Sequence, residues 1–192
     1  RNGHSDYTAA QVGVRALLAS LPGWNDGQGA ERYAVEQVAQ LDSKDMGFDV
    51  WAKLALRVAH FLAQGDVQGI VITHGTDTLE ETAYFLQALL APHKPVVLTC
   101  AMRPSNALVP DGPQNLLDAL AVASSAGASG VTVVCAGAIY AAEEVQKIHP
   151  YRLNAFSAGD AGPIGFVEQG RLRLLRGWPR GQALATVAGL AD

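Results

Sequence analysis

A hydroxyl and a carboxylate stand side by side at Thr76 and Asp77, between an apolar run and a helical pattern. A threonine hydroxyl becomes a nucleophile for acyl transfer when a neighbouring base takes its proton, and a carboxylate can hold a basic amine or a cationic group of a substrate. The same pair is also explained by helix capping, which is common in turns between strands and helices. The local pattern alone leaves both interpretations open.

The segments around this pair predict a strand, a loop and a helix. Residues 69–73 form a short run rich in β-branched side chains, which predicts a buried strand. Thr78 followed three residues later by Glu81 predicts a capping box at the start of a helix that continues through Leu89. In an open α/β sheet, ligands bind at loops of this kind because unpaired amides and the helix dipole point there. The loop with Thr76 and Asp77 is therefore the candidate site.

Three ordered segments resemble the bacterial L-asparaginase family, whose members hydrolyse side-chain amides. They are His-Gly-Thr-Asp-Thr-Leu-Glu-Glu-Thr-Ala at 74–83, Ala-Met-Arg-Pro-Ser at 101–105 and Asp-Gly-Pro-Gln-Asn at 111–115. The resemblance extends across nearly the whole chain. Two parts of the family pattern are missing: a Thr-Gly-Gly-Thr-Ile-Ala-like segment with the first catalytic threonine, and a second domain. The first nucleophile therefore has no counterpart in this numbering.

The resemblance implies hydrolysis of L-asparagine to L-aspartate and ammonia through a threonine nucleophile. Alternatives within the enzyme class are a glutaminase-asparaginase of broader specificity and the amide-releasing subunit of a tRNA-dependent amidotransferase. The alternative from another class is a non-catalytic fragment that binds an amino acid. Because the first threonine is missing, we expect the 192 residues alone to be inactive.

The resemblance also assigns the catalytic residues. They are Thr76, Asp77, Lys147 and Tyr7, the last on a mobile loop that closes over the substrate in the family. A lone lysine in a polar stretch is nearly always solvated, so Lys147 is singled out by the family segment around it. Burial lowers the pKa of an amine, which would make Lys147 a usable base for the Thr76 hydroxyl. Backbone amides at the start of the following helix suit an oxyanion.

The substrate-binding residues implied by the resemblance are Ser43, Lys44 and Ala101, together with Thr76 and Asp77. In the family, the serine at the position of Ser43 holds the α-carboxylate of the substrate. A serine in such a turn is also explained by capping. Lys44 stands where the family commonly has glutamine, so we expect a shift in side-chain selectivity. Arg103 is expected to shape its loop through an ion pair or a bond to a carbonyl.

Length and composition predict one α/β domain, because 192 residues with 49% hydrophobic and 17% charged residues provide one sizeable core. We expect a Rossmann-like or flavodoxin-like three-layer fold with a mainly parallel sheet. The expected strands are 33–39, 69–73, 94–100 and 130–136, the expected helices are 8–20, 49–64, 78–89 and 113–122, and a hairpin is expected at 165–175. Residues 1–176 would form the domain, with its first strand missing, and residues 177–192 a linker towards an absent C-terminal domain.

Composition also limits the partners. A net charge of −4 without a cluster of Lys and Arg gives no footprint for nucleic acid. No apolar run approaches the roughly 20 residues that span a bilayer. The five histidines lack metal-ligand spacing and no glycine-rich phosphate loop is present, so we expect no metal and no cofactor. The resemblance implies a small amino-acid substrate and a homotetramer built as a dimer of dimers. The expected location is the cytoplasm, with the periplasm left open.

Overall fold

The computed structural model describes residues 12–22, 24 and 32–185. Its helices are α1 (Val14–Ala19), α2 (Phe48–Leu62), α3 (Leu79–Leu90) and α4 (Gly112–Ala123), with two 3-10 turns, η2 (Ser43–Asp45) and η3 (Gly159–Ala161). Its strands are β1 (Ile70–Thr73), β2 (Pro95–Thr99), β3 (Gly130–Cys135), β4 (Ala138–Ala141), β5 (Gln146–Lys147), β6 (Phe156–Ser157), β7 (Gly165–Glu168) and β8 (Arg171–Leu174). Within the described residues no helix combines the length and apolarity needed to cross a membrane.

The main sheet has the strand order β1-β2-β3-β4-β7-β8, and β5 and β6 form a separate pair. Strands β1, β2 and β3 are parallel, whereas β4, β7 and β8 add to the sheet by antiparallel pairing. The carboxyl ends of β1 and β2 are level, because Thr73 pairs with Thr99. The loops that follow these two strands therefore meet at one edge of the sheet. The predicted α/β class is confirmed, with the sheet parallel only in its first half.

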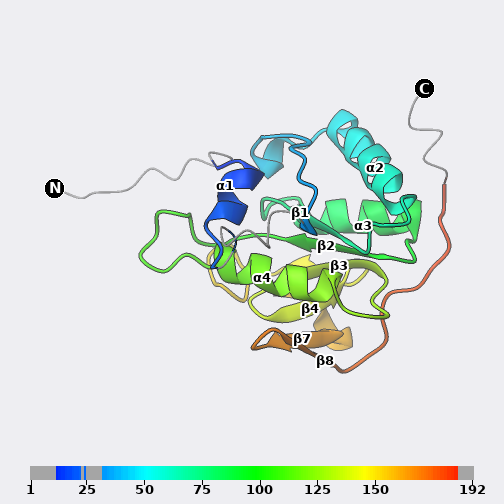
Figure 1. Cartoon of the computed structure of the whole chain (residues 1–192). Coiled ribbons are helices and arrows are strands. Elements are labelled where there is room, and N and C mark those ends of the chain that lie inside the picture. Colours follow the sequence, from blue (N-terminus) through cyan, green and yellow to red (C-terminus); the bar gives the residue numbers. More distant parts are fainter. Residues whose placement is uncertain (1–11, 23, 25–31, 186–192) are drawn as a thin grey trace.

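Helices cover both faces of this sheet, which gives the expected three layers (Figure 1). On one face, α2 and α3 pack against alternate strand residues such as Val96 and Leu98. On the other face, α4 packs against the intervening residue Val97, and α1 packs on α4 through Leu18. Side chains alternate between the faces of a strand, so a strand buried on both sides is apolar throughout. This accounts for the continuous apolar runs in the sequence.

Two sequence predictions near the start of the described chain are wrong. Residues 33–39 are not a strand, because this run pairs with no strand of the described sheet, of which β1 is the first strand. The run is nonetheless held to the domain, since Val38 packs against the core beside α2. Helix α1 begins at Val14, after an extended Gly13, and not near residue 8. The predicted capping box at residues 8–11 lies outside the described residues.

The C-terminal hairpin is confirmed as β7 and β8. Its turn residues Gln169 and Gly170 both have positive φ, 53° and 73°, which a tight hairpin turn requires. Beyond the hairpin, Trp178 packs against the core beside α4, and the amide of Leu184 donates to the carbonyl of Ala88 on α3 at 2.8 Å. Residues 177–185 therefore lie against the domain.

Candidate active site

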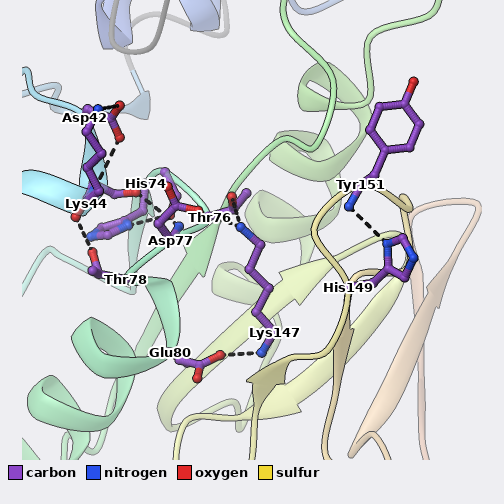
Figure 2. A network of polar contacts seen from close by, with 12 residues as sticks. Asp42, Lys44, His74, Thr76, Asp77, Thr78, Glu80, Lys147, His149 and Tyr151 are labelled. Atoms are coloured by element: carbon purple, nitrogen blue, oxygen red, sulfur yellow. Dashed lines mark hydrogen bonds and ion pairs between the residues drawn. The ribbon is translucent and has the colours of Figure 1, made fainter.

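A lysine amine joins the hydroxyl and the carboxylate that were singled out in the sequence. Lys147 Nζ lies 2.8 Å from Thr76 Oγ1 and 2.7 Å from Asp77 Oδ1, although 71 residues separate Lys147 from Thr76. Figure 2 shows the lysine reaching from β5 to the loop after β1. The side chain of Lys147 is 20% exposed and that of Asp77 is 51% exposed. The arrangement brings a hydroxyl, an amine and a carboxylate together at the edge of the sheet, with the carboxylate exposed.

The main chain of Lys147 is held as firmly as its side chain. The pairing of β5 with β6 fixes the backbone of this segment, and the amide of Lys147 donates to Glu80 Oε2 on the first turn of α3. Helix α3 starts three residues after Thr76, so the backbone amide and the side-chain amine of Lys147 bond to neighbouring parts of one segment, residues 76–80. The backbone of the lysine is therefore fixed close to the hydroxyl that its amine contacts.

Ser43 packs against the loop from the other side. It is buried, with 5% of its surface exposed, and its Oγ accepts a hydrogen bond from the amide of Asp77 at 3.1 Å. Gly75 makes this contact feasible, because a Cβ at that position would lie 2.7 Å from Ser43 Cβ. The turn η2 and the loop after β1 thus lie in direct contact through a glycine and a serine.

The helix start at Thr78 differs from the predicted capping box. Thr78 is the N-cap residue of α3, but its side chain makes no capping bond. Its hydroxyl instead donates to the carbonyl of Ser43 at 2.7 Å. The box prediction was wrong because a distant backbone acceptor competes for the hydroxyl. The two bonds between Ser43 and residues 77 and 78 fasten the loop to η2.

The remaining predicted residues lie around this centre. Lys44 points its amine at Asp42, with Nζ 2.8 Å from Oδ2, and this hydrogen bond raises the pKa of Lys44. Ala101 is half-buried and begins the loop that Asp111 closes, since the carboxylate of Asp111 accepts the amides of Met102 and Arg103 at 2.9 and 2.8 Å. Tyr7 lies outside the described residues.

Arg103 acts on its own loop. Its Nη1 donates to the carbonyl of Val109 at 3.1 Å, which matches the carbonyl contact expected from the sequence. Among the residues that the structure describes, no cluster of three or more His, Cys, Asp or Glu side chains is arranged to hold a metal ion.

Comparison with known proteins places this geometry in a family. The family model described as "Asparaginase, N-terminal" matches residues 2–180. The chain belongs to the asparaginase family. It is 39% identical over 165 residues to L-asparaginase 2 of Bacillus subtilis strain 168, a match that covers 85% of this chain and 43% of the relative. It is 40% identical over 167 residues to the glutaminase-asparaginase of Pseudomonas fluorescens biotype A, covering 86% of this chain and 45% of the relative.

A solved asparaginase structure has the same fold. The crystal structure of a probable cytoplasmic L-asparaginase from Campylobacter jejuni matches with a TM-score of 0.85 at 36% identity, covering 94% of this chain and 58% of that one. The chain spans less than half the length of the curated asparaginases named above. The match therefore concerns the part of these enzymes that carries the Thr76 loop and Lys147.

Sequence reasoning about this asparaginase domain missed four residues that hold the loop. They are Glu80, His74, Thr82 and Trp51, and the sequence pattern gives none of them a role. His74 Nδ1 lies 2.7 Å from the carbonyl of Gly75, and Nε2 lies 3.0 Å from Thr82 Oγ1. Trp51 Nε1 donates to the same Thr82 oxygen at 2.8 Å. The sequence contains one signal for this network: Thr82 is a polar residue on the apolar face of a helix, four residues after Thr78.

Burial sets the charge of His74. Removal from water lowers the pKa of the imidazole below its ordinary value, and this effect outweighs the hydrogen bond to Gly75 and the charge of Glu81, both of which raise it. The ring is therefore neutral at pH 7. A neutral imidazole has one donor and one acceptor nitrogen, so its two hydrogen bonds have defined directions.

Proposed function

We propose that the protein carrying this chain hydrolyses the side-chain amide of L-asparagine to L-aspartate and ammonia. The observation that carries the proposal is the position of Lys147 Nζ, within hydrogen-bond distance of both Thr76 Oγ1 and Asp77 Oδ1. A hydroxyl next to an amine that a carboxylate orients has the parts of a nucleophile, a base and its partner. The names of the relatives support the same substrate class.

In the proposed reaction, the amine of Lys147 takes the proton of the Thr76 hydroxyl as the oxygen attacks the amide carbon. The proton passes to the leaving nitrogen, which departs as ammonia, and water then cleaves the acyl ester to give aspartate and the free hydroxyl. Asp77 holds the lysine and is in reach of the α-ammonium of the substrate. We propose that the turn of Ser43 and the loop that begins at Ala101 contact the substrate, that Lys44 tunes side-chain selectivity, and that Tyr7 closes the site.

A broader glutaminase-asparaginase is the second candidate function. The specific support is the Pseudomonas fluorescens glutaminase-asparaginase, whose identity of 40% is within one per cent of the 39% identity of the Bacillus subtilis L-asparaginase 2. Lys44 lies at the edge of the site, and its length differs from that of the glutamine expected there. The ratio of kcat/KM for glutamine and asparagine decides between the two candidates.

The decisive experiment measures ammonia release by the complete protein and by its Thr76→Val variant. Loss of release in the variant, with an unchanged fold by circular dichroism, supports the proposal. Binding of asparagine without any release in either protein would favour a non-catalytic binding module. We expect the 192 residues alone to release no appreciable ammonia, because the first threonine of the family is not among them.

Assembly and location are also part of the proposal. We propose a homotetramer, arranged as a dimer of dimers, as the family resemblance implies. Exposed apolar side chains on loops near the site, such as Leu108 and Tyr151, which are 100% and 84% exposed, support contacts between copies there. Light scattering of the complete protein tests this. Residues 177–192 would lead from the domain of residues 1–176 to a second domain.

For the location we propose the cytoplasm, supported by the Campylobacter jejuni structure, whose protein is named a probable cytoplasmic L-asparaginase. A relative from Haemophilus influenzae, 35% identical over 171 residues, is named a probable periplasmic enzyme. Fractionation of cells that contain the complete protein distinguishes the cytoplasm from the periplasm.

A further inference from the structure

A chain of hydrogen bonds that the proposed reaction does not use leads through a buried helix residue to the Thr76 loop. It runs from Trp51 Nε1 to Thr82 Oγ1, from Thr82 Oγ1 to His74 Nε2, and from His74 Nδ1 to the carbonyl of Gly75. Thr82 is fully buried. Figure 2 shows the ring of His74 beside the loop that carries Thr76 and Asp77. The chain ends on the peptide bond that enters Thr76.

The direction of each bond follows from the groups involved. A carbonyl only accepts, so His74 Nδ1 carries the proton and donates to Gly75. In the neutral ring Nε2 is then an acceptor, and the Thr82 hydroxyl is the group that donates to it. The indole of Trp51 can only donate, and it occupies a lone pair of the Thr82 oxygen.

The Thr82 hydroxyl has a second acceptor within reach. Its oxygen lies 2.8 Å from the carbonyl of Thr78. That carbonyl also accepts the amide of Thr82 at 3.1 Å within the helix, and a carbonyl has two lone pairs, so it can accept the hydroxyl as well. The hydroxyl has a single proton, and the acceptor nitrogen of His74 has no other donor among the residues that the structure describes. A proton directed to the imidazole is the arrangement that leaves both acceptors with a donor.

The bond to Gly75 fixes the orientation of the next amide. In a planar trans peptide the C=O and the following N–H point in opposite directions. With the carbonyl of Gly75 turned to His74, the N–H of Thr76 points away from the ring. Within residues 12–22, 24 and 32–185, this N–H donates no hydrogen bond. The neighbouring amide of Asp77, by contrast, is taken by Ser43.

We propose that His74 is a positioning residue, which turns the Gly75–Thr76 peptide so that the Thr76 amide faces the oxygen that becomes negative during amide hydrolysis. Thr82 and Trp51 hold the ring in the tautomer that this task requires. This inference rests on the proposed function, because it needs a reaction with an oxyanion. A donor at that place acts on the transition state more than on the bound substrate, so its loss lowers kcat more than it raises KM.

The test compares two substitutions of His74 in the complete protein. The amide nitrogen of His74→Asn sits near the place of Nδ1 and keeps a donor for Gly75, whereas the longer His74→Gln puts its polar group near Nε2 and leaves the carbonyl without its donor. We expect kcat for asparagine to fall at least about tenfold in His74→Gln, with KM changed less than about twofold, and to stay within about threefold in His74→Asn. The exposed His93, at the far end of α3, supplies the control His93→Asn, which should match the unchanged protein.

Thr82 provides a second route to the same answer if His74→Gln does not fold. Thr82→Val removes the hydroxyl at nearly constant shape, and Thr82→Ser restores it, so the first should repeat the kcat loss and the second should recover it. Independently of activity, the imidazole nitrogen shifts of His74 at pH 7.5 should show a protonated Nδ1 and a bare Nε2.

Four outcomes separate this inference from the proposed function. A protonated Nε2 with a bare Nδ1 overturns the inference, and so does a kcat within twofold of the original in folded His74→Gln or Thr82→Val. A loss of activity in Thr76→Val alongside either result leaves the proposed function standing. Full activity of Thr76→Val refutes the proposed function itself.

Discussion

Replacing Gly75 with alanine tests the contact between the Thr76 loop and the turn that carries Ser43. A Cβ at position 75 would lie 2.7 Å from Ser43 Cβ and closer still to Ser43 Oγ, whereas carbon atoms in contact are about 3.5–4.0 Å apart. Ser43 is 5% exposed and cannot retreat into solvent. The loop and the turn must therefore separate in the variant.

The expected loss of stability follows from three contributions. Overpacking a buried contact costs about 1–3 kcal/mol. Losing the bond from the Asp77 amide to Ser43 Oγ costs about a further 1 kcal/mol. The reduced freedom of alanine in the unfolded chain offsets about 0.4–1 kcal/mol. The net loss is therefore about 1–3.6 kcal/mol, which lowers the melting temperature of a chain of this size by roughly 2–14 °C.

Urea unfolding of a double-mutant cycle measures this effect. Ser43→Gly removes both atoms that the new methyl group would meet, so in that background Gly75→Ala should cost less than about 0.5 kcal/mol. The coupling between the two positions should then reach at least about 1 kcal/mol. Gly65→Ala is the matched control, because a Cβ there meets nothing within 4 Å. An equal cost of Gly75→Ala with and without Ser43→Gly would refute the reasoning.

Three further predictions concern the site. In the complete protein, Thr76→Val and Lys147→Met should each lower kcat by about 10² to 10⁴, and the double variant should be little worse, because the two groups act as a unit. A double variant whose loss in kcat equals the product of the two single losses would show that the residues act separately. Asp77→Asn should lower kcat/KM for asparagine at least about tenfold more than kcat/KM for the analogue of asparagine that lacks the α-amino group, since a charge-assisted bond contributes about 1.5–3 kcal/mol. Equal losses with both substrates would show that Asp77 does not bind the α-ammonium and acts only through its contact with Lys147. Burial lowers the pKa of His74, so the unfolded chain binds its proton first on acidification. The stability from this group is complete above about pH 6.5 and is lost below it by at most about 1.4 kcal/mol per pH unit; His74→Asn should flatten that part of the pH curve of urea unfolding, and an unchanged slope would contradict the assignment.

The elements that the sequence predicted well are those whose own residues determine them. Strand β1 and helix α3 were expected at 69–73 and 78–89 and occur at Ile70–Thr73 and Leu79–Leu90. Their length and apolar periodicity suffice to place them. Helix α3 buries one face, whereas β1, predicted as a buried strand, is only half-buried because it is the end strand of the described sheet. The hairpin was equally local, since Gln169-Gly170 adopts the positive φ that the turn needs.

The failures come from interactions that the local pattern does not contain. Residues 33–39 alternate like a strand, but a strand also needs a neighbour for its amides and carbonyls, and β1 does not supply one. Strand β5 has only two residues and exists through its pairing with β6. Thr78 and Glu81 match a capping box, yet the Thr78 hydroxyl bonds to Ser43 instead. In each case a contact distant in sequence decides the structure.

The candidate site depends on the same kind of distant contact, and this explains why Thr76 and Asp77 alone left two interpretations open. A free lysine side chain loses about 1.5–2 kcal/mol of rotamer entropy when it is fixed. In this structure the backbone amide of Lys147 donates to Glu80, and its side-chain amine bonds to Thr76 and Asp77. Both the backbone and the amine of the lysine are therefore held at the start of helix α3. The fold has therefore already ordered the amine before any substrate arrives. A pair that served only as a helix cap would not require a lysine from 70 residues away to be held in this way, and this favours chemistry over capping at Thr76.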